Sequence, residues 1–115
     1  MLSRGDPAEA LDLIREAIRI VESHRQFPVC GEVYATEAWA LALLGRTDEA
    51  NQTLERALQR PAPEPREKGE LHLQAGGALL ALQRPDEARK HFQLGRDADP
   101  KGKYGRRCRD MLQRM

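Results

Sequence analysis

The chain has 115 residues, a formal net charge of +1, four Phe or Tyr residues and a single Trp. This length supports one domain with a modest core, and the near-neutral charge gives no field that favours nucleic acid or a membrane surface. Cys30 and Cys108 stand 78 residues apart without a CxxC pair, which argues against a zinc ribbon or a disulfide framework and predicts free thiols in a reducing compartment.

No membrane or export segment is predicted. No apolar run is long enough to span a bilayer, and residues 1–6 contain no apolar signal segment. With Met1 as the natural start, we expect a cytoplasmic protein. If Met1 is not the natural start, a signal could lie elsewhere in the parent protein.

The first predicted element is a helix over residues 6–24. Pro7 suits the first helical turn, and Glu9 places a negative charge near the positive end of the helix dipole. A helix that is apolar around much of its girth needs neighbours on more than one side. The apolar residues of this segment would lie around much of the helix, so it needs more than one neighbour. They are Leu11, Leu13, Ile14, Ala17, Ile18, Ile20 and Val21.

Two predicted helix pairs follow, over residues 31–60 and 66–99. The first helix of each pair is expected over residues 32–44 and 68–82, and Gly45 suits the end of the former as a C-cap. Apolar residues at helical spacing support both predictions: Tyr34, Ala38 and Leu41 in one, and Leu71, Ala75 and Leu79 in the other.

An internal repeat runs through the chain. Three stretches align without gaps: Gly5-Asp6-Pro7-Ala8-Glu9-Ala10, Gly45-Arg46-Thr47-Asp48-Glu49-Ala50 and Gln83-Arg84-Pro85-Asp86-Glu87-Ala88. The match continues downstream with a large apolar residue and then a small one: Ile14, Leu54 and Phe92, followed by Ala17, Ala57 and Gly95. A small residue allows close approach of a neighbouring helix, and the large residue one turn on fills the space between helices.

The last predicted element is a basic helix within residues 101–115. Its charged residues are Lys101, Lys103, Arg106, Arg107, Arg109 and Arg114 against Asp110. A polar terminal helix is what a stack of repeats needs as its cap, and no base-reading motif accompanies the charges. We therefore expect a solvated cap and no nucleic-acid binding, although an acidic partner peptide across Arg106 and Arg109 remains an alternative.

These features resemble the tetratricopeptide repeat family, a helix–turn–helix repeat. One repeat is carried by Ala38, Leu41, Gly45, Ala50, Leu54 and Ala57, and the next by Gly76, Leu79, Ala88, Phe92, Gly95 and Pro100. The resemblance implies an all-α fold, a right-handed α-solenoid of antiparallel helix pairs with about six helices, in one domain over residues 1–115. The repeat spacing of 40 and then 38 residues exceeds the usual 34, which indicates longer helices and connectors near residues 23–29 and 61–65.

The segment 6–24 resembles the second helix of a repeat that lacks its first helix. Three explanations remain open. The chain could be part of a longer repeat array, it could form a homodimer through this N-terminal helix, or the exposed surface could simply be tolerated.

The resemblance also implies a binding groove, lined by the first helix of each repeat. The groove residues it assigns are Glu32, Ala35, Trp39, Leu43, Glu70, Leu73, Gly77, Leu80, Arg106 and Arg109. Some members of the family grip a terminal carboxylate with basic side chains at such positions. Here Ala35, Thr36, Trp39, Glu70 and Gln74 stand there instead, so this mode of binding is not expected.

Trp39 allows two interpretations. It could anchor a partner, because Trp is enriched at binding hot spots, or it could pack between adjacent helices, because Trp is often buried. The leading hypothesis is a protein–protein interaction scaffold that binds a peptide segment or helix in an apolar concave groove. The alternative is a self-associating regulatory or sensor tail of a larger enzyme or transcription factor.

Catalysis, cofactors and metal binding are not predicted. His24, His72 and His91 form no HxxxH or HExxH pair, whereas a metal site needs three or four convergent ligands. No nucleophile elbow or phosphate loop is present.

Overall fold

The computed structural model describes residues 6–24 and 29–115, and this part of the chain is all-helical. It contains six helices and no strand, which confirms the predicted fold class. The bounds are α1 (Pro7–Glu22), α2 (Gly31–Leu43), α3 (Thr47–Leu58), α4 (Pro65–Ala81), α5 (Pro85–Ala98) and α6 (Lys103–Arg114). None of these six helices combines the length and apolar character that a membrane crossing requires.

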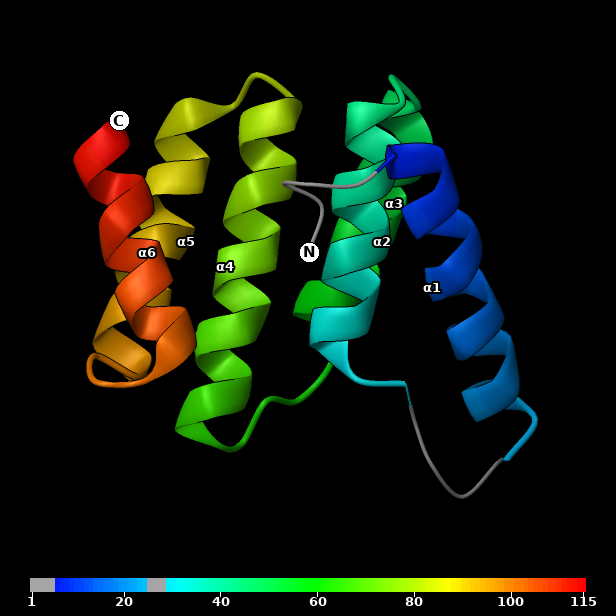
Figure 1. The fold of residues 1–115 in the computed structure, drawn as a ribbon, viewed down its shortest axis with the longest axis horizontal. Helices are drawn as coiled ribbons and strands as arrows, with labels where there is room; N and C mark the ends of the chain where they lie inside the picture. The colour runs from blue at the N-terminus through cyan, green and yellow to red at the C-terminus, as the bar shows by residue number, and fades with distance from the viewer. Residues whose placement is uncertain (1–5, 25–28) are drawn as a thin grey trace.

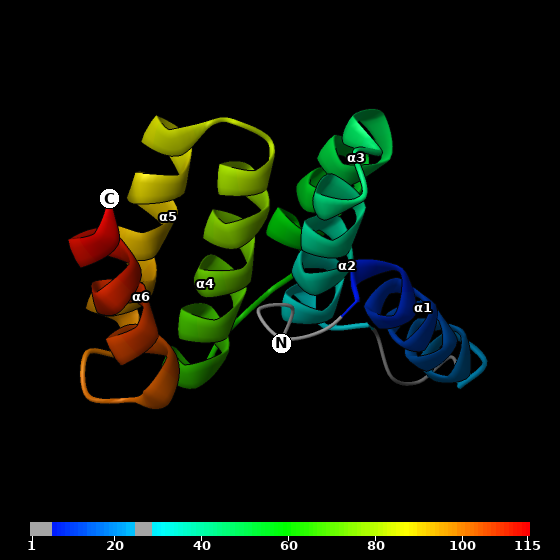
Figure 2. The same cartoon turned by 45° about the horizontal axis from the view of Figure 1, so that its top comes forward.

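The helices form two layers. Figure 1 shows α2, α4 and α6 side by side, with α3 behind α2 and α5 behind α4 and α6, and Figure 2 shows the same order with the top of the molecule turned forward. Within each pair, α2 with α3 and α4 with α5, the helices run antiparallel and contact each other. The central helix α4 contacts α2, α5 and α6. This stack of antiparallel helix pairs is the solenoid that the repeat predicts.

Both helix pairs turn by the same backbone geometry. After α2, the amide of Arg46 donates to the carbonyl of Leu41 at 2.9 Å, and an equivalent bond follows α4. The residue before the donor adopts the left-handed conformation, with φ of 77° at Gly45 and 62° at Gln83. This arrangement satisfies helix-end carbonyls that would otherwise lack a partner. Gly45 therefore ends α2 as predicted, one residue after the C-cap Leu44, and Gln83 takes the same position after the C-cap Leu82 of α4 without being glycine.

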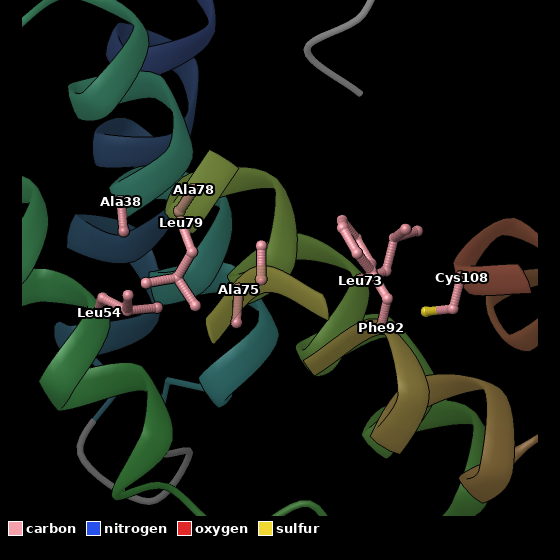
Figure 3. Close-up of a cluster of buried hydrophobic side chains, with 9 residues drawn as sticks. Ala38, Leu54, Leu73, Ala75, Ala78, Leu79, Phe92 and Cys108 are labelled. Atoms are coloured by element: carbon pink, nitrogen blue, oxygen red, sulfur yellow. The ribbon is translucent and has the colours of Figure 1, made fainter. Parts of the chain in front are cut away.

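The largest core cluster extends from α2 to α6 (Figure 3). Phe92 of α5 is fully buried in it. A Cβ atom at Gly76 of α4 would stand 2.5–2.7 Å from carbons of the Phe92 ring, so the ring lies directly against the α4 backbone. The buried members are Ala38, Leu54, Leu73, Ala75, Ala78, Leu79, Ala88, Phe92 and Cys108.

The helix α4 begins earlier than the sequence predicts, at Pro65 instead of near Lys68. Proline is tolerated in the first helical turn because its missing amide hydrogen would have no helical partner there. The last proline of the Pro-rich connector is therefore part of the helix. The other predicted connector, at residues 23–29, lies partly outside the described residues.

Candidate binding surface

The predicted groove residues of α2 and α4 follow the line along which these two helices meet. We call this surface the α2–α4 seam and define it by Glu32, Thr36, Trp39 and Leu43 of α2 with Glu70, Gln74, Gly77 and Leu80 of α4. One contact sets its register, that of Trp39 with Gly77. Consistent with this register, the carboxylate of Glu70 is near enough to raise the pKa of Glu32. Both pairs are 38 residues apart, which is also the spacing of the second repeat.

Three of the predicted groove residues are buried. Ala35 and Leu73 are 0% and 4% exposed, and Gly77 is buried against the indole ring of Trp39. These residues pack between the helices beneath the surface of the seam. They present almost no surface to a partner.

Trp39 packs between helices and is also partly exposed. A Cβ atom at Gly77 would stand 2.6–2.7 Å from carbons of its indole ring, and Trp39 contacts two of the buried core clusters. The residue as a whole is only partly buried. Trp39 therefore packs between helices and also leaves some surface that a partner could contact, so both interpretations drawn from the sequence have a physical basis.

Carboxylates gather at the end of the seam where α2 begins. Burial raises the pKa of Glu32, and the nearby carboxylates of Glu70 and Glu67 raise it further. Burial also raises the pKa of the neighbouring Cys30 thiol, and the same three carboxylates add to this. A thiol with a raised pKa is a poor nucleophile at neutral pH, so this end of the seam is acidic and unreactive.

The opposite end of the seam is apolar. Leu43 is 45% exposed, and Leu80 is partly buried against the largest core cluster. Two further predicted groove residues, Arg106 and Arg109, are exposed on α6. In the described part of the chain, neither arginine forms a hydrogen bond or an ion pair with a residue of the seam.

Ion pairs and packing attach α1 to one side of the stack. Arg15 pairs with Glu37 of α2 at 3.1 Å and with Glu49 of α3 at 3.3 Å. Leu11 and Ile18 of α1 are buried in two core clusters that α2 shares. The contact with α2 therefore uses only one face of α1.

The repeat positions of α1 are less covered than those of the later repeats. Ala10 and Ile14 pack half-buried against core clusters, whereas Ala17 is exposed. Leu13 and Ile20 beside them are 66% and 53% exposed. The matching residues of α3 and α5 are at most 4% exposed: Ala50, Leu54, Ala57, Ala88 and Phe92. No helix in the described part of the chain fills the place that α2 and α4 take in those repeats.

A cleft of about 310 Å³ between α3 and α5 has no counterpart in the sequence analysis. Its rim is bridged by Arg84, which donates to the side-chain oxygen of Asn51 at 2.7 Å. The lining residues are Asn51, Leu54, Glu55, Leu58, Leu79, Arg84, Glu87 and His91. Periodicity within one helix could not predict these lining residues together, because they come from α3, α4, and α5 with its N-cap residue.

A histidine pair lies beside this cleft. His72 of α4 and His91 of α5 place their Nδ1 atoms 3.0 Å apart, and their rings stack with centroids 5.2 Å apart. Burial lowers the pKa of His72 to about 4, helped by the positive charges that His91 and Lys68 can carry. Burial also lowers the pKa of His91, against the opposing effect of Glu87. The residues that the structure describes contain no group of three or more ligands that could hold a metal ion.

We expect the histidine pair to make stability depend on pH. Because folding lowers the pKa of His72, the unfolded chain binds the proton more readily, and stability falls as pH drops from about 6.5 to about 4. The loss should be on the order of 1 kcal/mol after allowance for solvent screening. Urea unfolding across this range should show a shallower pH dependence for His72→Gln than for the wild type. Equal pH dependence of the two proteins would contradict this assignment.

Two family models, both described as tetratricopeptide repeat, match the chain. One matches residues 44–107, which is more than half of the chain, and the other matches residues 31–56. No curated protein and no solved structure shows significant similarity to the chain. The matched residues include all of the residues that define the α2–α4 seam and all that line the cleft between α3 and α5.

Proposed function

Because this chain belongs to the tetratricopeptide repeat family, whose repeats generally mediate protein–protein interaction, we propose that it binds a peptide segment or helix of another protein along the α2–α4 seam. Its role is that of a scaffold without catalysis. The observation that carries the proposal is Trp39, a partly exposed indole that is held in place by Gly77 and followed one turn later by the exposed Leu43. Tryptophan is enriched at binding hot spots, and the exposed Leu43 adds apolar contact surface beside it.

Leu43→Gln should weaken partner binding and leave the fold intact. Leu43 is 45% exposed, so its loss removes contact surface without opening a cavity in the core. We expect affinity capture with the wild type to recover a partner that Leu43→Gln loses. Titration of the purified partner, followed by the fluorescence of the single tryptophan, should give a dissociation constant on the order of micromolar.

Leu94→Gln is the matched control for this experiment. Leu94 lies on α5 in the other layer and is 51% exposed, so the two substitutions remove similar exposed surfaces. If both variants recovered the same partner with the same affinity as the wild type, the seam would not be the binding surface. Circular dichroism of both variants checks that the helices are retained.

Self-association through α1 is a second candidate, which rests on its uncovered apolar face. In this case the protein would form a homodimer or act as a regulatory tail within a larger assembly. Sedimentation velocity should then show association that rises with concentration and is lost in Ala17→Glu, since Ala17 lies at the centre of this face. A stable monomer at high concentration would count against it.

A further inference from the structure

The α2–α4 seam presents two chemically different ends at a fixed separation. Glu32 and Glu70 mark the acidic end, and the apolar part begins one step along the seam at Trp39 and Gly77 and continues to Leu43 and Leu80. In each helix the acidic end and the start of the apolar part are seven residues apart, so they lie about 10 Å from each other at the rise of an α-helix. An extended peptide covers that distance with about three residues.

The acidic end has more negative than positive charge near it. The carboxylates of Glu67 and Glu70 are close enough to Glu32 to raise its pKa. The nearby Glu70 carboxylate raises the pKa of Tyr104 on α6, and Arg66 acts in the opposite direction. In the described part of the chain the ion pairs lie on other surfaces, at Arg15, Arg19, Arg46, Arg84 and Arg96.

Two buried oxygen atoms along the seam accept no hydrogen bond from the described residues. They are Oε2 of Glu32 and Oε1 of Gln74. Gln74 is only 5% exposed and lies one helical turn after Glu70, on the same face of α4. A buried acceptor without a donor is unfavourable. Because the protein covers both oxygens, their side chains would have to turn toward an incoming N–H group before either could accept from it.

We propose that the seam selects a peptide segment of a particular chemistry. A lysine or arginine of the peptide lies against Glu32 and Glu70, and an aliphatic or aromatic residue of the peptide lies against Trp39 and Leu43. In an extended segment the two residues are separated by about three positions. Charge complementarity supports this occupant, because the carboxylates attract a cation and repel an acidic segment. The inference rests on the proposed function and adds the chemistry of the partner to it.

Selection from a random dodecapeptide display library on the full chain tests this inference. We expect the wild type to enrich peptides in which Lys or Arg stands about three residues from Leu, Ile or Phe. The best peptide should change the fluorescence of Trp39, the single tryptophan of the chain, and should bind less tightly at high salt.

Two double variants separate the effect of the seam from that of overall charge. Glu32→Gln/Glu70→Gln removes the acidic end and should lower affinity for the selected basic peptide about tenfold, because two partly exposed ion pairs are lost. Asp12→Asn/Glu55→Gln makes the same change in net charge on α1 and α3, where both residues are exposed. It should leave the affinity unchanged.

The outcomes distinguish this inference from the proposed function. Selected peptides without an excess of basic residues, or a basic preference that survives Glu32→Gln/Glu70→Gln, would overturn the inference. If such peptides still bound less tightly to Leu43→Gln, the proposed function would stand. If the library gave no peptide whose binding changed the fluorescence of Trp39, both would fail.

Discussion

Phe92→Ala should destabilise the protein by about 3–5 kcal/mol, the range typical of a large core residue replaced by alanine. Phe92 is fully buried within the largest core cluster, where α4 and α6 meet α5. Its ring lies against Gly76, and the α4 backbone cannot move in to fill the space without disturbing α2. A loss of this size is a large part of the stability of a typical domain, about 5–15 kcal/mol.

Urea unfolding followed by circular dichroism measures this loss. Leu94→Ala is the control, because Leu94 lies on the same helix and is 51% exposed. It should change stability by no more than about 0.5 kcal/mol, as expected for a surface substitution. Similar losses for the two variants would show that Phe92 is not at the centre of the core.

Gly105→Ala should also destabilise the protein strongly, although alanine favours helices. Gly105 lies in the first turns of α6, and a Cβ atom there would collide with the backbone carbonyl of Asp99. A backbone group cannot rotate away as a side chain can, so α6 would have to shift from its place on α5. We expect a loss of about 3 kcal/mol from overpacking, which exceeds the gain of about 1 kcal/mol in helix propensity.

The exposed Gln113 on the same helix provides the comparison for Gly105. Gln113→Ala raises helix propensity without meeting any backbone and should leave stability nearly unchanged. Thermal unfolding of both variants separates the two effects. If Gly105→Ala were as stable as Gln113→Ala, the close approach of α6 to Asp99 would not limit the stability of the protein.

The repeat made the fold predictable from the sequence. Three aligned stretches located the second helices, and Gly45 marked a turn that the structure places in the left-handed conformation. Gln83 occupies the same turn in the next repeat, but glutamine has no preference for that conformation. Only its alignment with Gly45 indicated the turn.

The candidate site was less predictable, because helical spacing does not show which neighbour covers a residue. Ala35 and Leu73 share a repeat position next to seam residues, yet both are buried. The approach of Trp39 to Gly77 and the pairing of His72 with His91 join residues on different helices. Such contacts depend on how the helices pack, and sequence spacing within one helix carries no information about that.

The composition of α4 has a consequence for how the protein unfolds. Gly69, Gly76 and Gly77 each cost about 1 kcal/mol of helix propensity relative to alanine, so this segment is a poor helix by itself. At Gly76 and Gly77 the rings of Phe92 and Trp39 occupy the space that a Cβ atom would need, and at Gly69 the Cβ atom of Tyr104 would stand 3.2 Å from it. Helical arrays can lose their repeats one at a time. Here the central helix is ordered only while its neighbours hold it, so the two halves should melt together as one cooperative unit.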